Sequence, residues 1–78
     1  MRKLKLIWDF RGPVAEQTAK HHVIHLKDYI KHHQLDIEIT GIETISDMHS
    51  YAFMVVDEPQ MPKIRDDLKP HRGQLYQP

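Results

Sequence analysis

The feature that most restricts the fold is an unbroken apolar run at residues 51–56, Tyr-Ala-Phe-Met-Val-Val. A polar, turn-like segment at 46–50 precedes it, and an acidic, proline-containing segment at 57–62 follows it. An apolar run of this length between turn signals is typical of a strand buried on both faces. The sequence therefore predicts that residues 51–56 form a central strand of a sheet.

The first third of the chain predicts a strand followed by a long helix. Residues 3–10 alternate, which indicates a strand with one strongly apolar face. Its apolar positions are Leu4, Leu6, Trp8 and Phe10. Gly12 and Pro13 break the strand, and proline suits the first turn of a helix. From there to about His33 apolar residues recur at helical spacing. They are Ala15, Ala19, Leu26 and Ile30, with Val23 beside them.

The remaining segments complete the predicted element order. Residues 35–45 are rich in Ile and Thr and are interpreted as a second strand, in which Gly41 indicates a bulge or bend. The acidic and proline residues at 57–62 lead into a short helix that contains Ile64 and Leu68 and stops at Pro70. Residues 74–78 form either a closing edge strand or a tail.

This order matches the split β-α-β unit of ferredoxin-like folds. We predict one α+β domain over residues 1–78, of the β-α-β-β-α-β type. Right-handed crossovers place the first and third strands together in an antiparallel sheet, with both helices on one face. The other face then carries apolar residues of the third strand, and a second copy packed sheet to sheet is expected to cover them. The sequence therefore predicts a homodimer.

Composition restricts the partners and the location. The 78 residues include 11 Lys or Arg and 11 Asp or Glu, so no net charge favours nucleic acid or an anionic membrane. No apolar segment approaches the ~18 residues of a membrane span, and Asp9 comes too early for a signal peptide. The absence of cysteine fits a reducing compartment. We expect a cytoplasmic protein that binds neither nucleic acid nor membrane.

At the level of pattern, most of the chain resembles the dimeric α+β barrel superfamily. The resemblance is carried by the opening strand at 5–8, the helix segment Ala-Lys-His-His-Val-Ile-His-Leu at 19–26, the strand at 51–56, and the acidic, proline-marked turn into 64–68. It implies a homodimer with a ferredoxin-like fold. The superfamily includes cofactor-free oxygenases, haem-degrading enzymes and isomerases, so the resemblance implies no particular catalytic residue or cofactor.

Two histidines of the long helix are the candidate catalytic residues. His22 borders the apolar stripe beside Ala19 and Leu26, where an imidazole either packs with one hydrogen bond or acts as a general base. A cleft between helix and sheet would bring it near Trp8 or Tyr51. His25 is the alternative base.

The candidate ligand-binding residues are Trp8, Asp9, Arg11 and Tyr51. An Asp9–Arg11 pair at the end of the first strand would either hold an anionic substrate, since guanidinium binds carboxylate or phosphate bidentately, or form a surface ion pair. Trp8 and Tyr51 would either stack on a flat ligand or belong to the core or dimer interface.

The long helix also carries a histidine-rich face. His21 and His25 are four residues apart, a spacing at which two imidazoles can chelate a metal, and Asp28 follows. A stable site needs a further ligand, and no Glu lies between the histidines as in zinc-protease helices. A solvated polar face is the simpler interpretation, so we assign no metal site.

The function expected from these features is binding of a small organic ligand in a helix–sheet cleft of a homodimer. Two alternatives stay open. One is an enzyme of the oxygenase or isomerase type with a histidine base, and the other is a metal-binding module that uses the helix histidines. The residues identify no particular cofactor, and they leave open whether the protein is an enzyme.

Overall fold

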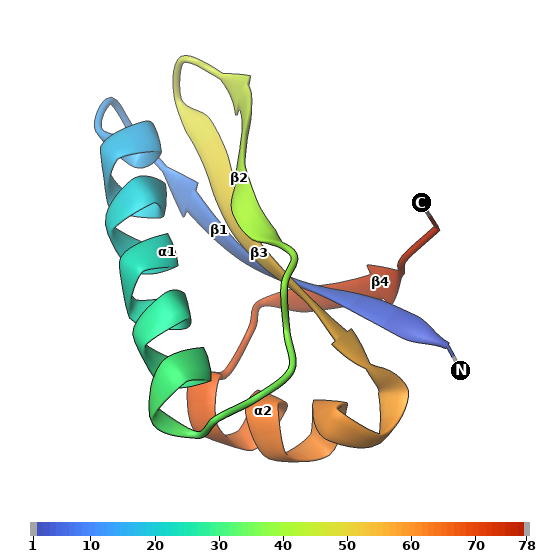
Figure 1. Cartoon of the computed structure of the whole chain (residues 1–78). Helices are drawn as coiled ribbons and strands as arrows, with labels where there is room; N and C mark the ends of the chain where they lie inside the picture. Colours follow the sequence, from blue (N-terminus) through green and yellow to red (C-terminus); the bar gives the residue numbers. More distant parts are fainter. Residues whose placement is uncertain (1, 78) are drawn as a thin grey trace.

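A four-stranded antiparallel sheet forms the centre of the computed structural model, which describes residues 2–77. The elements are β1 (Lys3–Arg11), α1 (Ala15–His32), β2 (Thr40–Ser46), β3 (His49–Asp57), the 3-10 turn η1 (Glu58–Gln60), α2 (Met61–Leu68) and β4 (Arg72–Leu75). The strands lie in the order β2-β3-β1-β4 (Figure 1). This is the predicted β-α-β-β-α-β arrangement, and residues 72–75 form its closing strand.

The central pair of strands defines the two faces of the sheet. β1 pairs antiparallel with β3, and Leu6 lies opposite Met54 while Trp8 lies opposite Ala52. Directly opposite residues point to the same face, and these four belong to the buried core beneath the helices. The prediction that the first and third strands lie side by side is confirmed.

The helix α1 covers one face of the sheet along most of its length (Figure 1). Its buried residues are Ala15, Ala19, Val23 and Leu26, and Ile30 packs against the core at its edge. Gly12 precedes it with φ +113°, a conformation that favours glycine, and its N–H donates to the carbonyl of Met48 at 2.8 Å. The predicted apolar stripe is confirmed. Within residues 2–77, no helix is long and apolar enough to cross a membrane.

The second strand is shorter than the predicted span 35–45. It begins only at Thr40, because the apolar residues before it belong to a connecting segment: Ile37 is buried and Leu35 packs against the core. The irregular register lies after Thr44 and not at Gly41. Gly41 instead lies under the Phe53 ring, since a Cβ added there would stand 3.0 Å from its Cζ.

Side chains of the same chain cover the helix-free face of the sheet. Its apolar residues Ile7, Tyr51 and Val55 are only 1%, 8% and 5% exposed. The Nζ of Lys5 stands 4.5 Å from the ring centroid of Phe53, and the guanidinium carbon of Arg72 stands 5.3 Å from that of Tyr51. The two cationic groups therefore lie over aromatic rings of this face, and its apolar residues are largely buried without a second copy.

Candidate functional site

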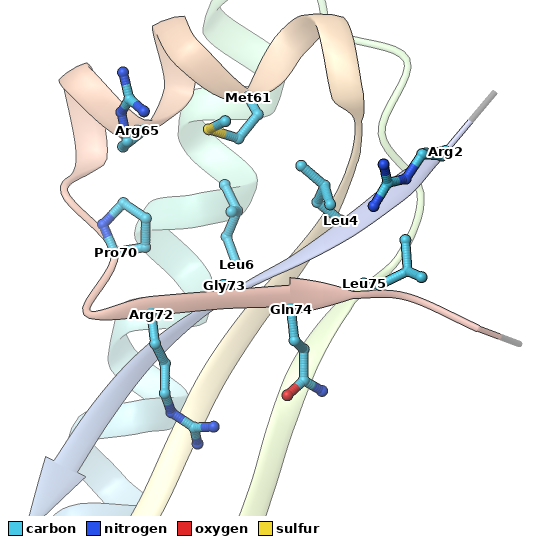
Figure 2. Close-up of a pocket in the computed structure, with 10 residues that line it drawn as sticks. All are labelled: Arg2, Leu4, Leu6, Met61, Arg65, Pro70, Arg72, Gly73, Gln74 and Leu75. Atoms are coloured by element: carbon cyan, nitrogen blue, oxygen red, sulfur yellow. The ribbon is translucent and has the colours of Figure 1, made fainter.

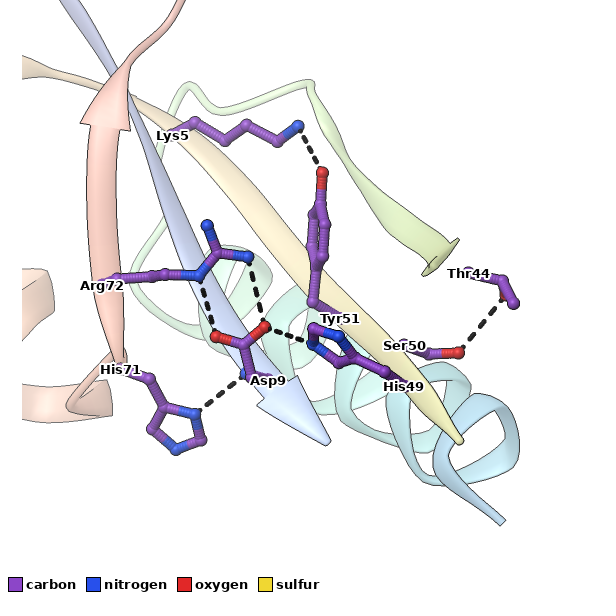
Figure 3. A network of polar contacts seen from close by, with 8 residues as sticks. All are labelled: Lys5, Asp9, Thr44, His49, Ser50, Tyr51, His71 and Arg72. Carbon is purple, nitrogen blue, oxygen red and sulfur yellow. Dashed lines mark hydrogen bonds and ion pairs between the residues drawn. The ribbon is translucent and has the colours of Figure 1, made fainter. Parts of the chain in front are cut away.

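A polar network joins three strands on the helix-free face (Figure 3). The carboxylate of Asp9 on β1 accepts hydrogen bonds from Arg72 on β4, at 2.8 Å from Nε and 3.2 Å from Nη2. Its Oδ1 also lies 2.8 Å from Nε2 of His49 on β3. The side chains of Asp9 and His49 are only 15% and 16% exposed. Asp9 is therefore the centre of the network.

The charges of the network stabilise each other. The Arg72 guanidinium lowers the pKa of the Asp9 carboxyl to about 2, against the opposing effect of burial, and Asp9 raises the pKa of Arg72. The backbone N–H of Asp9 donates to Nδ1 of His71 at 2.9 Å. In active sites where a histidine acts as the general base, a carboxylate often holds the imidazole in its orientation, as Asp9 holds His49 here. Here, however, Asp9 already occupies the guanidinium fork that would hold an anionic ligand.

The structure separates several of the predicted ligand-binding residues. Asp9 pairs with Arg72 and not with Arg11, which is exposed. Arg72 lies opposite Ile7, so it is a diagonal neighbour of Asp9 on the adjacent strand. Trp8 lies on the helix side, where its Nε1 donates to the Leu68 carbonyl at 2.8 Å, whereas Asp9 and Tyr51 lie on the opposite face. Trp8 and Tyr51 therefore cannot line one pocket.

The candidate catalytic histidines have different surroundings. The His22 ring packs near Trp8 and Phe10, with centroids 5.2 Å and 5.4 Å away, and its buried Nε2 has no hydrogen-bond partner within residues 2–77. Burial lowers the pKa of His22, which favours the neutral imidazole. His25 is exposed, and its ring centroid is 4.8 Å from that of His21.

The helix histidines gain no further ligand from the rest of the described chain. Over residues 2–77, no three His, Cys, Asp or Glu side chains come together in a way that could hold a metal ion. A metal-binding module built on His21 and His25 therefore has only the two imidazoles that the sequence already showed.

A groove of about 440 Å³ lies between α2 and the edge of the sheet formed by β1 and β4 (Figure 2). Its apolar lining consists of Leu4, Leu6, Met61, Pro70 and Leu75. Gly73 of β4 lies opposite Leu6 and therefore faces the groove. A Cβ added at Gly73 would stand 3.4 Å from Leu6 Cδ2, so a larger side chain would fill part of this space.

Cationic side chains stand at both ends of the groove. Arg65 lies at the end near Pro70, and Arg2 lies at the end near Leu75 (Figure 2). Their ion pairs are long and exposed, at 3.6 Å to Asp66 for Arg65 and 3.9 Å to Glu58 for Arg2. Pairs of this kind contribute little stability, so both guanidinium groups are available to an anion.

The groove exists because α2 is short. Its only buried residue is Ile64, and the helix ends where Lys69 adopts a left-handed conformation with φ 49°. Pro70 then leads the chain into β4, which the helix does not cover. This groove was not among the sites predicted from the sequence, although the alternation of β4 carries a signal for it: Gly73 supplies no side chain on the helix side.

No protein-family model, curated protein or solved structure matches this chain. The interpretation of its sites therefore depends on their geometry.

Proposed function

We propose that this protein binds an elongated organic ligand with an apolar middle and acidic ends, in the groove between α2 and β4. The observation that carries the proposal is the combination of an apolar lining with an arginine residue at each end. The proposal keeps the helix–sheet cleft expected from the sequence and moves it from α1 to α2.

The size and chemistry of the groove fit such a ligand. Its volume of about 440 Å³ lies in the range of ~300–1,000 Å³ that is usual for small-molecule sites. Burying apolar ligand surface contributes roughly 25 cal/mol per Å². Arginine binds a carboxylate through two parallel hydrogen bonds, which fixes the ends of the ligand.

Octanedioate, a chain with a carboxylate at each end, is a suitable probe. We expect binding of about millimolar affinity or tighter, followed as NMR shifts of backbone amides in α2 and β4. Gly73→Val should lower the affinity about tenfold or more, because the added side chain fills the groove. Arg65→Gln should lower the affinity to roughly a fifth of the wild-type value, because it removes one guanidinium. Gln74→Val is the matched control, since Gln74 points to the other side of β4 (Figure 2). Equal affinity of the Gly73→Val and wild-type proteins would refute the site.

We also propose, as a separate matter, the dimeric α+β barrel predicted from the sequence, in which two helix-free faces pack together. This face carries no helix within residues 2–77, so a second copy could pack against it over the side chains of Lys5 and Arg72 that already cover its aromatic rings. Because the groove lies on the opposite side of the sheet, ligand binding does not depend on the dimer. Native mass spectrometry tests the barrel, and a monomer at micromolar concentration would refute it.

A further inference from the structure

The outer edge of β4 offers free backbone groups. β4 is the last strand in the sheet order, and the N–H of Tyr76 donates to the carbonyl of Lys3 at 2.9 Å. In an antiparallel ladder the hydrogen-bonded pairs alternate, so Gln74 also bonds toward β1. The N–H and C=O groups of Gly73 and Leu75 consequently point to the free edge.

The same two residues face the groove. Leu75 lies opposite Leu4, and Gly73 lies opposite Leu6, on the helix side of the sheet. A strand that paired with Gly73 and Leu75 would place its directly opposite side chains on this side too. The free edge and the groove are therefore positioned to bind one extended segment together.

We propose that the ligand of the groove is an extended peptide that adds a strand to β4 and places acidic, apolar and acidic side chains in turn into the groove. This inference rests on the proposed function. A strand rises ~3.3 Å per residue, so positions i, i+2 and i+4 of the peptide span about 13 Å, the length of a four-residue strand such as β4. Main-chain hydrogen bonds supply affinity in this mode, and alternate side chains supply specificity.

The opposite edge of the sheet lacks these properties. β2 carries Glu43, and its register is irregular between Thr44 and Ser46, two features that discourage pairing with another strand. On the groove side, β4 carries only Gly73 and Leu75, and Leu75 is 44% exposed. Charge also favours an acidic segment, because both ends of the groove are cationic.

The test uses the peptide acetyl-Glu-Thr-Val-Thr-Glu-amide and two N-methylated forms of it. In the proposed complex the peptide runs antiparallel to β4, so the N–H of the central Val would donate to β4, whereas the N–H of each Thr would point away. N-methylation of Val should weaken binding by about tenfold or more, and N-methylation of the first Thr by less than about twofold. In NMR titrations, the amides of Gly73 and Leu75 should show the slowed hydrogen exchange of newly paired groups.

The outcomes separate this inference from the proposed function. If octanedioate binds in the groove but both N-methylated peptides bind equally well, strand addition is refuted and the small-ligand function stands. If neither octanedioate nor the peptide binds, both proposals fail. If the protein is a dimer that Gly73→Val converts into a monomer, a second copy occupies the edge, and the peptide proposal is overturned.

Discussion

The ion pair between Asp9 and Arg72 makes a measurable prediction about stability. The folded structure lowers the pKa of Asp9 from 3.8 to about 2. At ~1.36 kcal/mol per pH unit, this drop corresponds to about 2 kcal/mol at neutral pH. Because the Arg72 side chain is half exposed, solvent screening reduces the value. We therefore expect Asp9→Asn to lower the free energy of unfolding by about 1–2 kcal/mol at pH 7.

The sign of the pH dependence follows from the direction of this change. A carboxyl with a lowered pKa in the folded state contributes its full stabilisation above 3.8 and loses it as the pH falls through 3.8 toward 2. The carboxyl carbon signal of Asp9 in NMR should therefore stay constant from pH 7 down to about 3, where an ordinary carboxyl is mostly protonated.

Urea unfolding of four proteins measures the pair itself. They are the wild type, Asp9→Asn, Arg72→Gln and the double variant, and the coupling free energy should be about 1 kcal/mol. The exposed pair of Lys3 and Asp57 is the matched control and should give a smaller value. A coupling of zero, or an Asp9 signal that titrates near 3.8, would show that the network does not stabilise the fold as argued.

Three further predictions follow from single contacts. Trp8→Phe removes the hydrogen bond to the Leu68 carbonyl and should lower the free energy of unfolding by about 1–2 kcal/mol in urea titrations; an unchanged value would contradict the role of this bond. Burial lowers the pKa of His22, so stability should fall as the pH drops below 6.5, and His22→Leu should flatten that part of a melting-temperature profile. Gly41→Ala should destabilise the protein by about 1 kcal/mol because its Cβ meets Phe53, and the loss should shrink in a Phe53→Leu background.

The fold was predictable because its strongest signals are local. The apolar run at 51–56 and the alternation at 3–10 place both central strands, and helical spacing places α1. The cover of the helix-free face was harder to foresee. A sequence shows Lys5 and Arg72 as charged residues, whereas their cationic groups lie over the Phe53 and Tyr51 rings once the strands have paired.

The second strand shows where alternation misleads. Leu35 and Ile37 alternate with polar residues, as the residues of a strand do. They lie, however, in the segment that connects α1 to β2, and their side chains pack in or against the core. A period of two records which side chains are buried. It does not record whether the backbone has a neighbouring strand to pair with.

The Asp9–Arg72 pair and the groove were not predicted from the sequence, for a different reason. Asp9 and Arg72 are joined only by the register of β1 with β4, so the nearby Arg11 seemed the natural partner. The groove depends on Gly73, because this residue has no side chain to fill the space beside Leu6. The sequence shows the missing side chain at Gly73, but its place opposite Leu6 and the pairing of Asp9 with Arg72 follow only once β4 lies beside β1.

The pairing of β1 with β4 also shapes how the chain reaches its fold during synthesis. β1 precedes its neighbours in the chain, and one of them consists of residues 72–75, so one side of this central strand stays unpaired until β4 has been made. Strand pairing between distant segments is slow, and an unprotected strand can pair with another chain. A chain that stops before Arg72 would leave β1 as an edge strand, with its own residues Leu4 and Leu6 without partners on that side. Such a truncated protein should aggregate more readily than the chain that includes residues 72–75, in which β4 pairs with this side of β1.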